Sequence, residues 1–230
     1  MGLDVCIQPL IATIGNIEDY NSQEHYHCEL QMIKKLINII KSKITEQTNA
    51  PVDWNEEILD DNINDKDRIF CERIGNYNLI HHLRRYALHI EVNGKPPLDC
   101  SEDPCKDELL LKIYDDELKT SFPHLIDHSD CDGYYIPVEF PKPIWIKPSE
   151  IDIEEEVDNP LISIGSTINL LKELETINKY LQVNIDDLEN LENYSERITG
   201  DNNEFVKWCW GVLYQMSTNS IKFSQPIIFC

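Results

Sequence analysis

The chain has 230 residues, which is long enough to bury a core without disulfide or metal staples. Its residues are 41% apolar and 27% charged, a composition that excludes a disordered chain and is typical of a globular protein. With 20 Lys and Arg against 42 Asp and Glu, the net charge is −22. This charge argues against binding to nucleic acid or to an anionic membrane and favours a basic partner or cations. The simpler alternative is that an acidic surface only keeps the protein soluble.

Membrane and secretion signals are missing from the sequence. The opening MGLDVCIQPL lacks a basic stretch followed by a long apolar one, and no run approaches the roughly 18 apolar residues of a membrane span. The eight cysteines are scattered, and the spacing of Cys100 and Cys105 is not that of a zinc knuckle. We therefore expect reduced thiols, a cytoplasmic location and no membrane contact.

In the first half of the chain, β-branched residues over 5–14 predict a strand. Apolar residues at spacings of three and four then predict an amphipathic helix over 22–44. Residues 46–68 are polar and acidic and predict a long loop. A second helix is predicted over 76–90, ending before Gly94.

The middle of the chain predicts a shorter helix over 107–119. Three prolines within 136–146 favour an edge strand or a covering loop over a central strand. An acidic connector near 149–160 precedes the clearest helix of the chain, over 165–181, which Ser166 can cap.

The last part predicts a helix over 186–200, another over 204–216, and a strand or hairpin edge over 220–229. Together these elements predict one α+β domain over 1–230. We expect it to be mostly helical, with a small mixed or antiparallel sheet.

The stretch 127–140, DHSDCDGYYIPVEF, resembles the calcium-binding loop pattern when it is counted from His128. Asp130, Asp132 and Glu139 then occupy metal-ligand positions, and a glycine stands at position six. Against this, a histidine replaces the first aspartate and a proline falls at position ten. The alternatives are an aspartate-braced tight turn that enters a strand, or a site role for His128, Asp130 and Asp132.

A second stretch, 73–90, contains no acidic residue although the chain is strongly acidic. On a helix, His81 lies one turn before Arg84 and Arg85, so a proton carrier and a guanidinium could share a face and bind a carboxylate or phosphate. The alternative is that these arginines pair internally with the surplus acids and hold the fold together.

A pocket formed by the two stretches would bring an imidazole to a carboxylate, a pair able to move a proton. The candidates for proton transfer are His81, His128 and Asp130. The candidates for ligand binding are Arg73, Tyr77, His81, Arg84 and Asp132.

The segment R-x-G-x-Y-x-x-x-H-x-L-R, followed later by H-S-D-C-D-G, resembles a family of uncharacterised bacterial hypothetical proteins. The residues that carry the first segment are Arg73, Gly75, Tyr77, His81 and Arg84. Chains of that family tend to open MGLD, as this one does, and have a later Gly-Ser helix start like Gly165 and Ser166. The resemblance implies that the two segments belong to one unit, and it implies no activity.

Three functions remain open. The first is a non-enzymatic interaction protein that meets a basic protein partner, for example in an immunity or antitoxin-like role. The second is an enzyme or a binder of small anionic ligands that uses the basic helix facing the HSDCDG loop. The third is a degenerate cation-binding loop. No nucleotide, zinc-protease or hydrolase motif is present in the sequence, so no cofactor is predicted.

Overall fold

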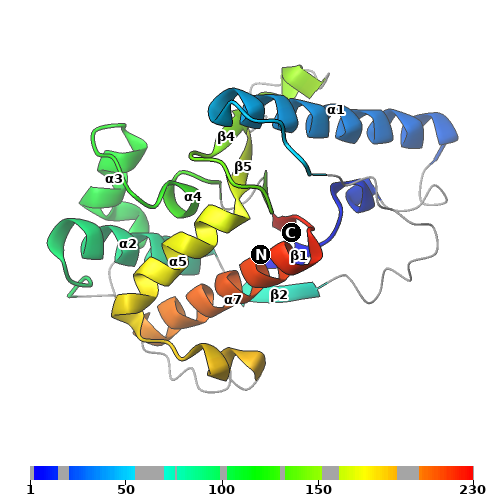
Figure 1. Cartoon of the computed structure of the whole chain (residues 1–230). Helices are drawn as coiled ribbons and strands as arrows, with labels where there is room; N and C mark the ends of the chain where they lie inside the picture. Colours follow the sequence, from blue (N-terminus) through cyan, green and yellow to red (C-terminus); the bar gives the residue numbers. More distant parts are fainter. Residues whose placement is uncertain are drawn as a thin grey trace.

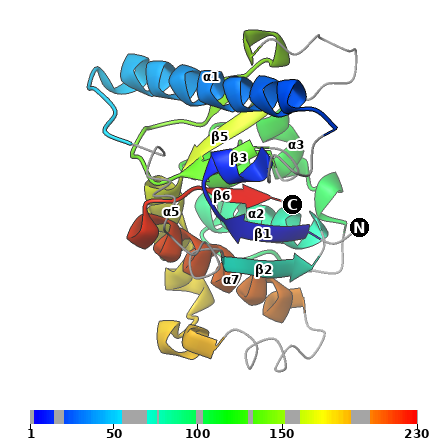
Figure 2. The ribbon, with the colours of Figure 1, turned by 90° about the vertical axis from the view of Figure 1, so that its right-hand side faces the viewer.

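A six-stranded mixed sheet crosses the protein (Figures 1 and 2). The computed structural model describes residues 3–14, 21–54, 70–75, 77–98, 103–129, 133–151, 161–190 and 202–229. The strands are β1 (Leu3–Ile7), β2 (Phe70–Gly75), β3 (Gly133–Ile136), β4 (Ile144–Ile146), β5 (Ile162–Ser166) and β6 (Ile227–Phe229). They lie in the order β2-β1-β6-β3-β5-β4. Only β3 and β5 pair in parallel, and the other neighbours are antiparallel.

Helices cover both faces of this sheet. The α-helices are α1 (Gln23–Thr48), α2 (Tyr77–Asn93), α3 (Glu108–Tyr114), α4 (Pro123–Ile126), α5 (Thr167–Leu181) and α7 (Asn202–Phe223). Short 3-10 turns are η1 (Leu10–Ile14), η4 (Pro104–Lys106), η5 (Pro148–Ile151) and η6 (Ile185–Asn190). The predicted α+β class is therefore confirmed.

Two hydrophobic clusters fill the space between the sheet and its helices, and β6 separates them. Ile227 and Phe229 pack with α2, α5 and α7, whereas the intervening Ile228 packs with Leu36 and Ile40 of α1. Successive side chains of a strand point to opposite faces, so α1 lies on one face and the other three helices on the opposite one. Figure 1 shows this separation, with α1 apart from the α2, α5 and α7 group.

The helices with strong periodicity match their predictions. Ser22 caps α1 by accepting a hydrogen bond from the His25 N–H at 3.1 Å. Ser166 caps α5 in the same way, through the Asn169 N–H at 3.1 Å. The helix predicted over 76–90 is α2, and the hydrogen bond that closes it runs from the Gly94 N–H to the Ile90 carbonyl oxygen.

Two strand predictions are wrong in position. The segment 220–229 was expected as a strand or hairpin edge, but residues up to Phe223 belong to α7 and β6 lies centrally, between β1 and β3. The strand predicted over 5–14 is β1 only as far as Ile7, and the chain then forms the 3-10 turn η1. Within 136–146, β4 is an edge strand as expected, and only Ile136 belongs to the central strand β3. The prolines fall between the two strands, where no ladder hydrogen bond is needed.

Some predicted elements lie partly outside the described residues. Most of the loop 46–68 and most of the acidic connector near 149–160 belong to that part of the chain. The helix predicted over 186–200 is described only as far as Asn190, and there it is the 3-10 turn η6. The helix over 107–119 is shorter than predicted, because α3 ends at Tyr114.

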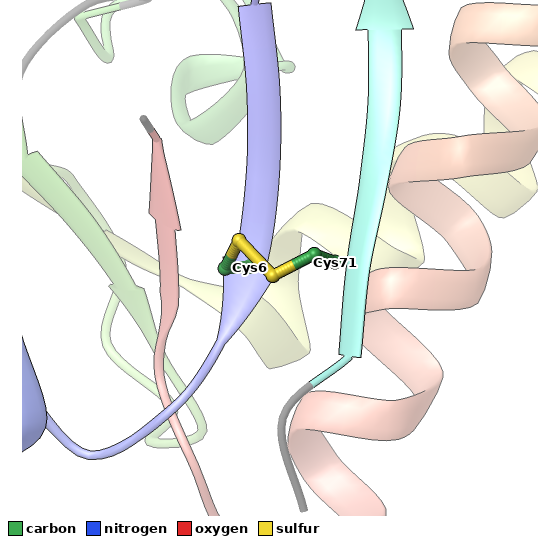
Figure 3. The surroundings of a disulfide bond; sticks show 2 residues. All are labelled: Cys6 and Cys71. Carbon is green, nitrogen blue, oxygen red and sulfur yellow. A yellow bond between two sulfur atoms is a disulfide. The ribbon is translucent and has the colours of Figure 1, made fainter. Parts of the chain in front are cut away.

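Cys6 of β1 and Cys71 of β2 face each other across the two strands and form a disulfide bond (Figure 3). Their Cα atoms are 4.1 Å apart, and 65 residues separate them in sequence. The expectation of reduced thiols is wrong for this pair. Cysteine spacing alone could not reveal it, because the pairing depends on the register of the two strands.

No helix among the described residues combines the length and the apolar character needed to cross a membrane.

Candidate functional site

The backbone of residues 120–129, which contains α4, is held by side chains from the surrounding elements, some exposed and some buried. From α2, Glu91 accepts hydrogen bonds from the Thr120 hydroxyl and the Ser121 N–H, both at 2.7 Å. From α5, Glu173 accepts from the N–H groups of His124 and Leu125 at 3.0 and 2.8 Å. These contacts satisfy N–H groups that the first turn of a helix leaves without partners.

Glu173 is a carboxylic acid in an apolar setting, with 7% of its surface exposed. Burial raises its pKa to about 8, although the hydrogen bonds from His124 and Leu125 act in the opposite direction. The proton on this group is therefore lost and gained near neutral pH rather than in acid.

His124 is a second anchor of the segment. The Tyr135 hydroxyl donates to its carbonyl oxygen at 2.7 Å, and its ring nitrogen Nδ1 accepts the Ser166 N–H at 3.0 Å. The ring proton must then lie on Nε2, which is 3.0 Å from the carbonyl oxygen of Phe140. Burial lowers the pKa of His124 to about 4, so the ring is neutral at physiological pH.

Arg84, a predicted ligand-binding residue, is buried and directed at the same segment. Its Nε donates to the Leu125 carbonyl oxygen at 2.8 Å, and its terminal nitrogen Nη2 donates to the carbonyl oxygen of His128. The basic helix and the HSDCDG stretch do meet, and the described contact is a guanidinium on two backbone carbonyl groups.

His128 is also buried, and its ring stacks on Tyr135 with the centroids 4.0 Å apart. The neutral ring is satisfied when Nδ1 donates to the Ser129 carbonyl and Nε2 accepts the Ser163 hydroxyl at 3.2 Å. Burial lowers its pKa to about 4. Like His124, it contributes packing and hydrogen bonds as a neutral side chain.

A pocket of about 460 Å³ opens beside these residues, between α2, α3, the 120–129 segment and β4. Three predicted residues line it, namely His81, Arg84 and His128. Arg73 and Tyr77 do not belong to its lining. Arg73 is exposed on β2, with its Nε 3.9 Å from a carboxylate oxygen of Asp4, and Tyr77 packs on the hydrophobic core at the start of α2.

The predicted cation-binding residues are only partly described. Asp130 and Asp132 lie outside the described residues, and Glu139 is exposed and forms an ion pair with Lys172. Within the described ranges, no group of three His, Cys, Asp or Glu side chains could hold a metal ion. The glycine of the pattern has a strand-pairing role, since a Cβ on Gly133 would lie 2.0 Å from the Ser163 carbonyl oxygen.

The mouth of the pocket carries residues that the sequence did not single out. Two are aromatic and exposed, Tyr114 and Trp145, and two are carboxylates, Asp116 and Asp127. We call these four residues the acidic–aromatic pocket. The sequence did contain a signal for this site. The acidic run Asp115–Glu117 follows the end of α3, where negative charge interacts unfavourably with the helix dipole, so helix stability does not explain the run.

A larger pocket of about 670 Å³ lies at the other end of α2. At its base, the carboxylate oxygen Oδ2 of Asp107 is 2.8 Å from Arg85 Nε and 2.9 Å from His89 Nε2. Asp107 also caps α3 through the Leu109 N–H at 3.0 Å. Arg85 therefore forms an internal ion pair with an acidic side chain, which is the alternative that the sequence left open for the arginines of this stretch.

The acidic side chains that the structure describes come from many elements, and most of them are exposed. Among those whose exposure is defined, Glu173 is buried and the side chain of Asp107 is 7% exposed. Outside the described residues the sequence is more acidic still, as in 152–160, which has five Asp and Glu and neither Lys nor Arg. The negative field of the protein therefore belongs to many separated carboxylates.

Comparison with known families gives one match. A family model with the description "Putative DNA-mimic protein" covers residues 1–229 of the chain. No curated protein and no solved structure matches it.

Proposed function

The chain belongs to this family of putative DNA-mimic proteins, and on that premise we propose that it binds a basic, DNA-binding protein in the place of DNA. The family match and the excess of acid together support an acidic interaction protein. In the more specific version of the proposal, the partner is a toxin that acts on DNA, and this protein is its antitoxin or immunity factor.

The observation that carries the proposal is a net charge of −22 on a folded chain whose described carboxylates are mostly exposed. Duplex DNA presents closely spaced negative phosphates, and proteins that bind it place Lys and Arg against them. A surface of separated carboxylates attracts the same basic groove and speeds the encounter at low salt.

The surroundings of Arg84, His124 and His128 support binding rather than proton transfer at these three residues. The Arg84 guanidinium donates hydrogen bonds to two backbone carbonyl groups of the protein itself. The pKa values of His124 and His128 are lowered to about 4 by burial, which leaves these rings neutral and unsuited to act as general acids at neutral pH.

The test is capture of partners from the native host at low salt, with the tagged protein as bait, followed by elution with duplex DNA. We expect DNA-binding proteins among the captured chains, released both by the duplex and by raising salt from about 50 to 200 mM. Captured proteins that neither DNA nor salt displaces would contradict the proposal.

A second measurement checks that the protein takes the place of DNA on the partner and does not itself bind DNA. A fluorescently labelled duplex should not bind the protein itself, since both are strongly negative, but it should be displaced from the captured partner in proportion to the added protein. Displacement by a D186N/D187N variant should be slightly weaker, because two exposed negative charges on η6 are removed.

A further inference from the structure

We propose that the acidic–aromatic pocket receives an arginine side chain of the basic partner. This inference rests on the proposed function and specifies where the partner's key contact falls.

Exposed aromatic side chains mark the pocket as a contact surface. Tyr114 is 48% and Trp145 42% exposed, and Leu111, one turn before Tyr114 on α3, is 44% exposed. Aromatic anchors that remain accessible in the free protein are enriched at the centres of protein–protein interfaces. Exposed aromatic rings next to carboxylates fit a partner side chain that carries positive charge and has a flat face to stack on the rings.

Neither carboxylate of the pocket forms a described ion pair. Among the described residues, no ion pair joins Asp116 or Asp127 to a Lys, Arg or His. Asp127 is half-buried, and that burial raises its pKa; the charges of Arg84 and, more weakly, Lys142 oppose the rise, whereas the Asp116 charge adds to it. A cation placed between the two carboxylates would offset both effects.

The backbone of both aspartates is held in place before any partner arrives. Asp116 has a left-handed backbone with φ of 58°, and its N–H donates to the Ile113 carbonyl oxygen at 3.0 Å. Asp127 ends α4, with its N–H 2.8 Å from the Pro123 carbonyl oxygen, in the segment that Glu173 and Arg84 hold. Binding at such a site costs little ordering of the backbone.

The chemistry of the lining selects the occupant. Two carboxylates repel an anion, and the described residues offer no three-ligand group for a metal ion. A guanidinium is planar, pairs with carboxylates through two parallel hydrogen bonds and stacks on the face of Trp or Tyr. A lysine ammonium offers the charge without the planar fork, so arginine is favoured.

The experiment compares two probes. A fluorescein-labelled peptide of alternating arginine and glycine is titrated against its lysine counterpart of equal length and charge, and binding is followed by anisotropy at low and moderate salt. We expect the arginine peptide to bind about fivefold more tightly.

Matched variants locate the effect. The D116N/D127N pair should weaken arginine-peptide binding about tenfold, whereas D186N/D187N, with the same change in net charge, should weaken it less than about twofold. Tyr114→Ala should abolish the preference for arginine, and Tyr114→Phe should keep it, since the ring remains. Melting temperatures check the folding of each variant, and the exposed Tyr114 pair tests the site even if the Asp127 change disturbs α4.

The outcomes separate the two proposals. Equal binding of the two peptides, or equal losses from the two aspartate pairs, would overturn the pocket. Salt-sensitive binding of both peptides would in that case leave the proposed function standing. If neither peptide binds at low salt, the attraction to basic chains is absent and both proposals fail.

Discussion

The guanidinium of Arg84 donates a hydrogen bond to the backbone carbonyl oxygen of His128, and so ties α2 to the residues that follow α4. A second bond, to the Leu125 carbonyl oxygen at 2.8 Å, holds the end of α4 in the same way. Two elements that are 41 to 44 residues apart in sequence are thus joined by one side chain.

Arg84→Lys should therefore destabilise the protein, because an ammonium on a flexible stem cannot serve both carbonyl groups at once. We expect the free energy of unfolding in urea to fall by about 2–3 kcal/mol. The matched control is Arg73→Lys on exposed β2, which should change it by less than about 0.5 kcal/mol. Equal effects of the two variants would show that Arg84 does not brace the segment.

Glu173 should make stability depend on pH in an unusual direction. Its folded pKa of about 8 lies above the ordinary value of 4.5, so the contribution of the protonated acid is fully present below about pH 4.5 and is lost as pH rises through about 8. Glu173→Gln keeps the shape without titrating, and the variant should gain stability relative to the natural protein between pH 5 and 8 by about 1–3 kcal/mol. Urea unfolding at both pH values measures this gain. A relative loss at pH 8 would mean that the two N–H bonds stabilise the charged carboxylate more than burial opposes it.

Gly165→Ala should be strongly destabilising for steric reasons. A Cβ at this position would lie 2.4 Å from the ring of Tyr135 and 2.9 Å from Cδ2 of His128, and that stacked pair is buried. We expect a loss of about 3 kcal/mol or more, measured by thermal and urea unfolding. Gly94→Ala is the control, because it meets no atom within 4 Å and adds only the strain of φ 68°, which costs about 1 kcal/mol.

Reduction of the Cys6–Cys71 bond should lower the free energy of unfolding by about 2–4 kcal/mol, because the bond closes a long loop in the unfolded chain. Cys71→Ser should produce the same loss and should make the protein insensitive to reductant. Cys28→Ser changes an exposed free thiol and should leave both the stability and its response to reductant unaltered. If the Cys71→Ser variant were as stable as the oxidised protein, the disulfide bond would not contribute to stability.

Helices were predictable from sequence wherever a face is buried along their length. Leu79, Leu83 and Ile90 repeat at helical spacing in α2, and all three are buried. The central position of β6 could not be predicted, because its three apolar residues give no period and follow closely on a helix. Its place between β1 and β3 is decided by pairing with strands far away in the chain.

The site was predictable only in part. The acid-free stretch in so acidic a chain made contact between the basic helix and the HSDCDG stretch one of the alternatives, and Arg84 does contact His128. The hydrogen bonds from Arg84 to backbone carbonyl groups could not be predicted, because every residue has a backbone acceptor and the sequence does not mark which one is contacted. Trp145, within a proline-rich stretch, reaches the pocket only through the register of β4 on β5.

The position of β6 also sets an order of events during synthesis. β1, close to the start of the chain, and β3, from its middle, are both bridged by residues 227–229. The sheet therefore cannot close until those residues have left the ribosome. Until then, the edges of β1 and β3 that β6 will fill are exposed, and such edges can pair with other nascent chains. The dense negative charge of the chain repels its own copies during that interval, so the acidity that would attract a basic partner also protects the protein while it folds.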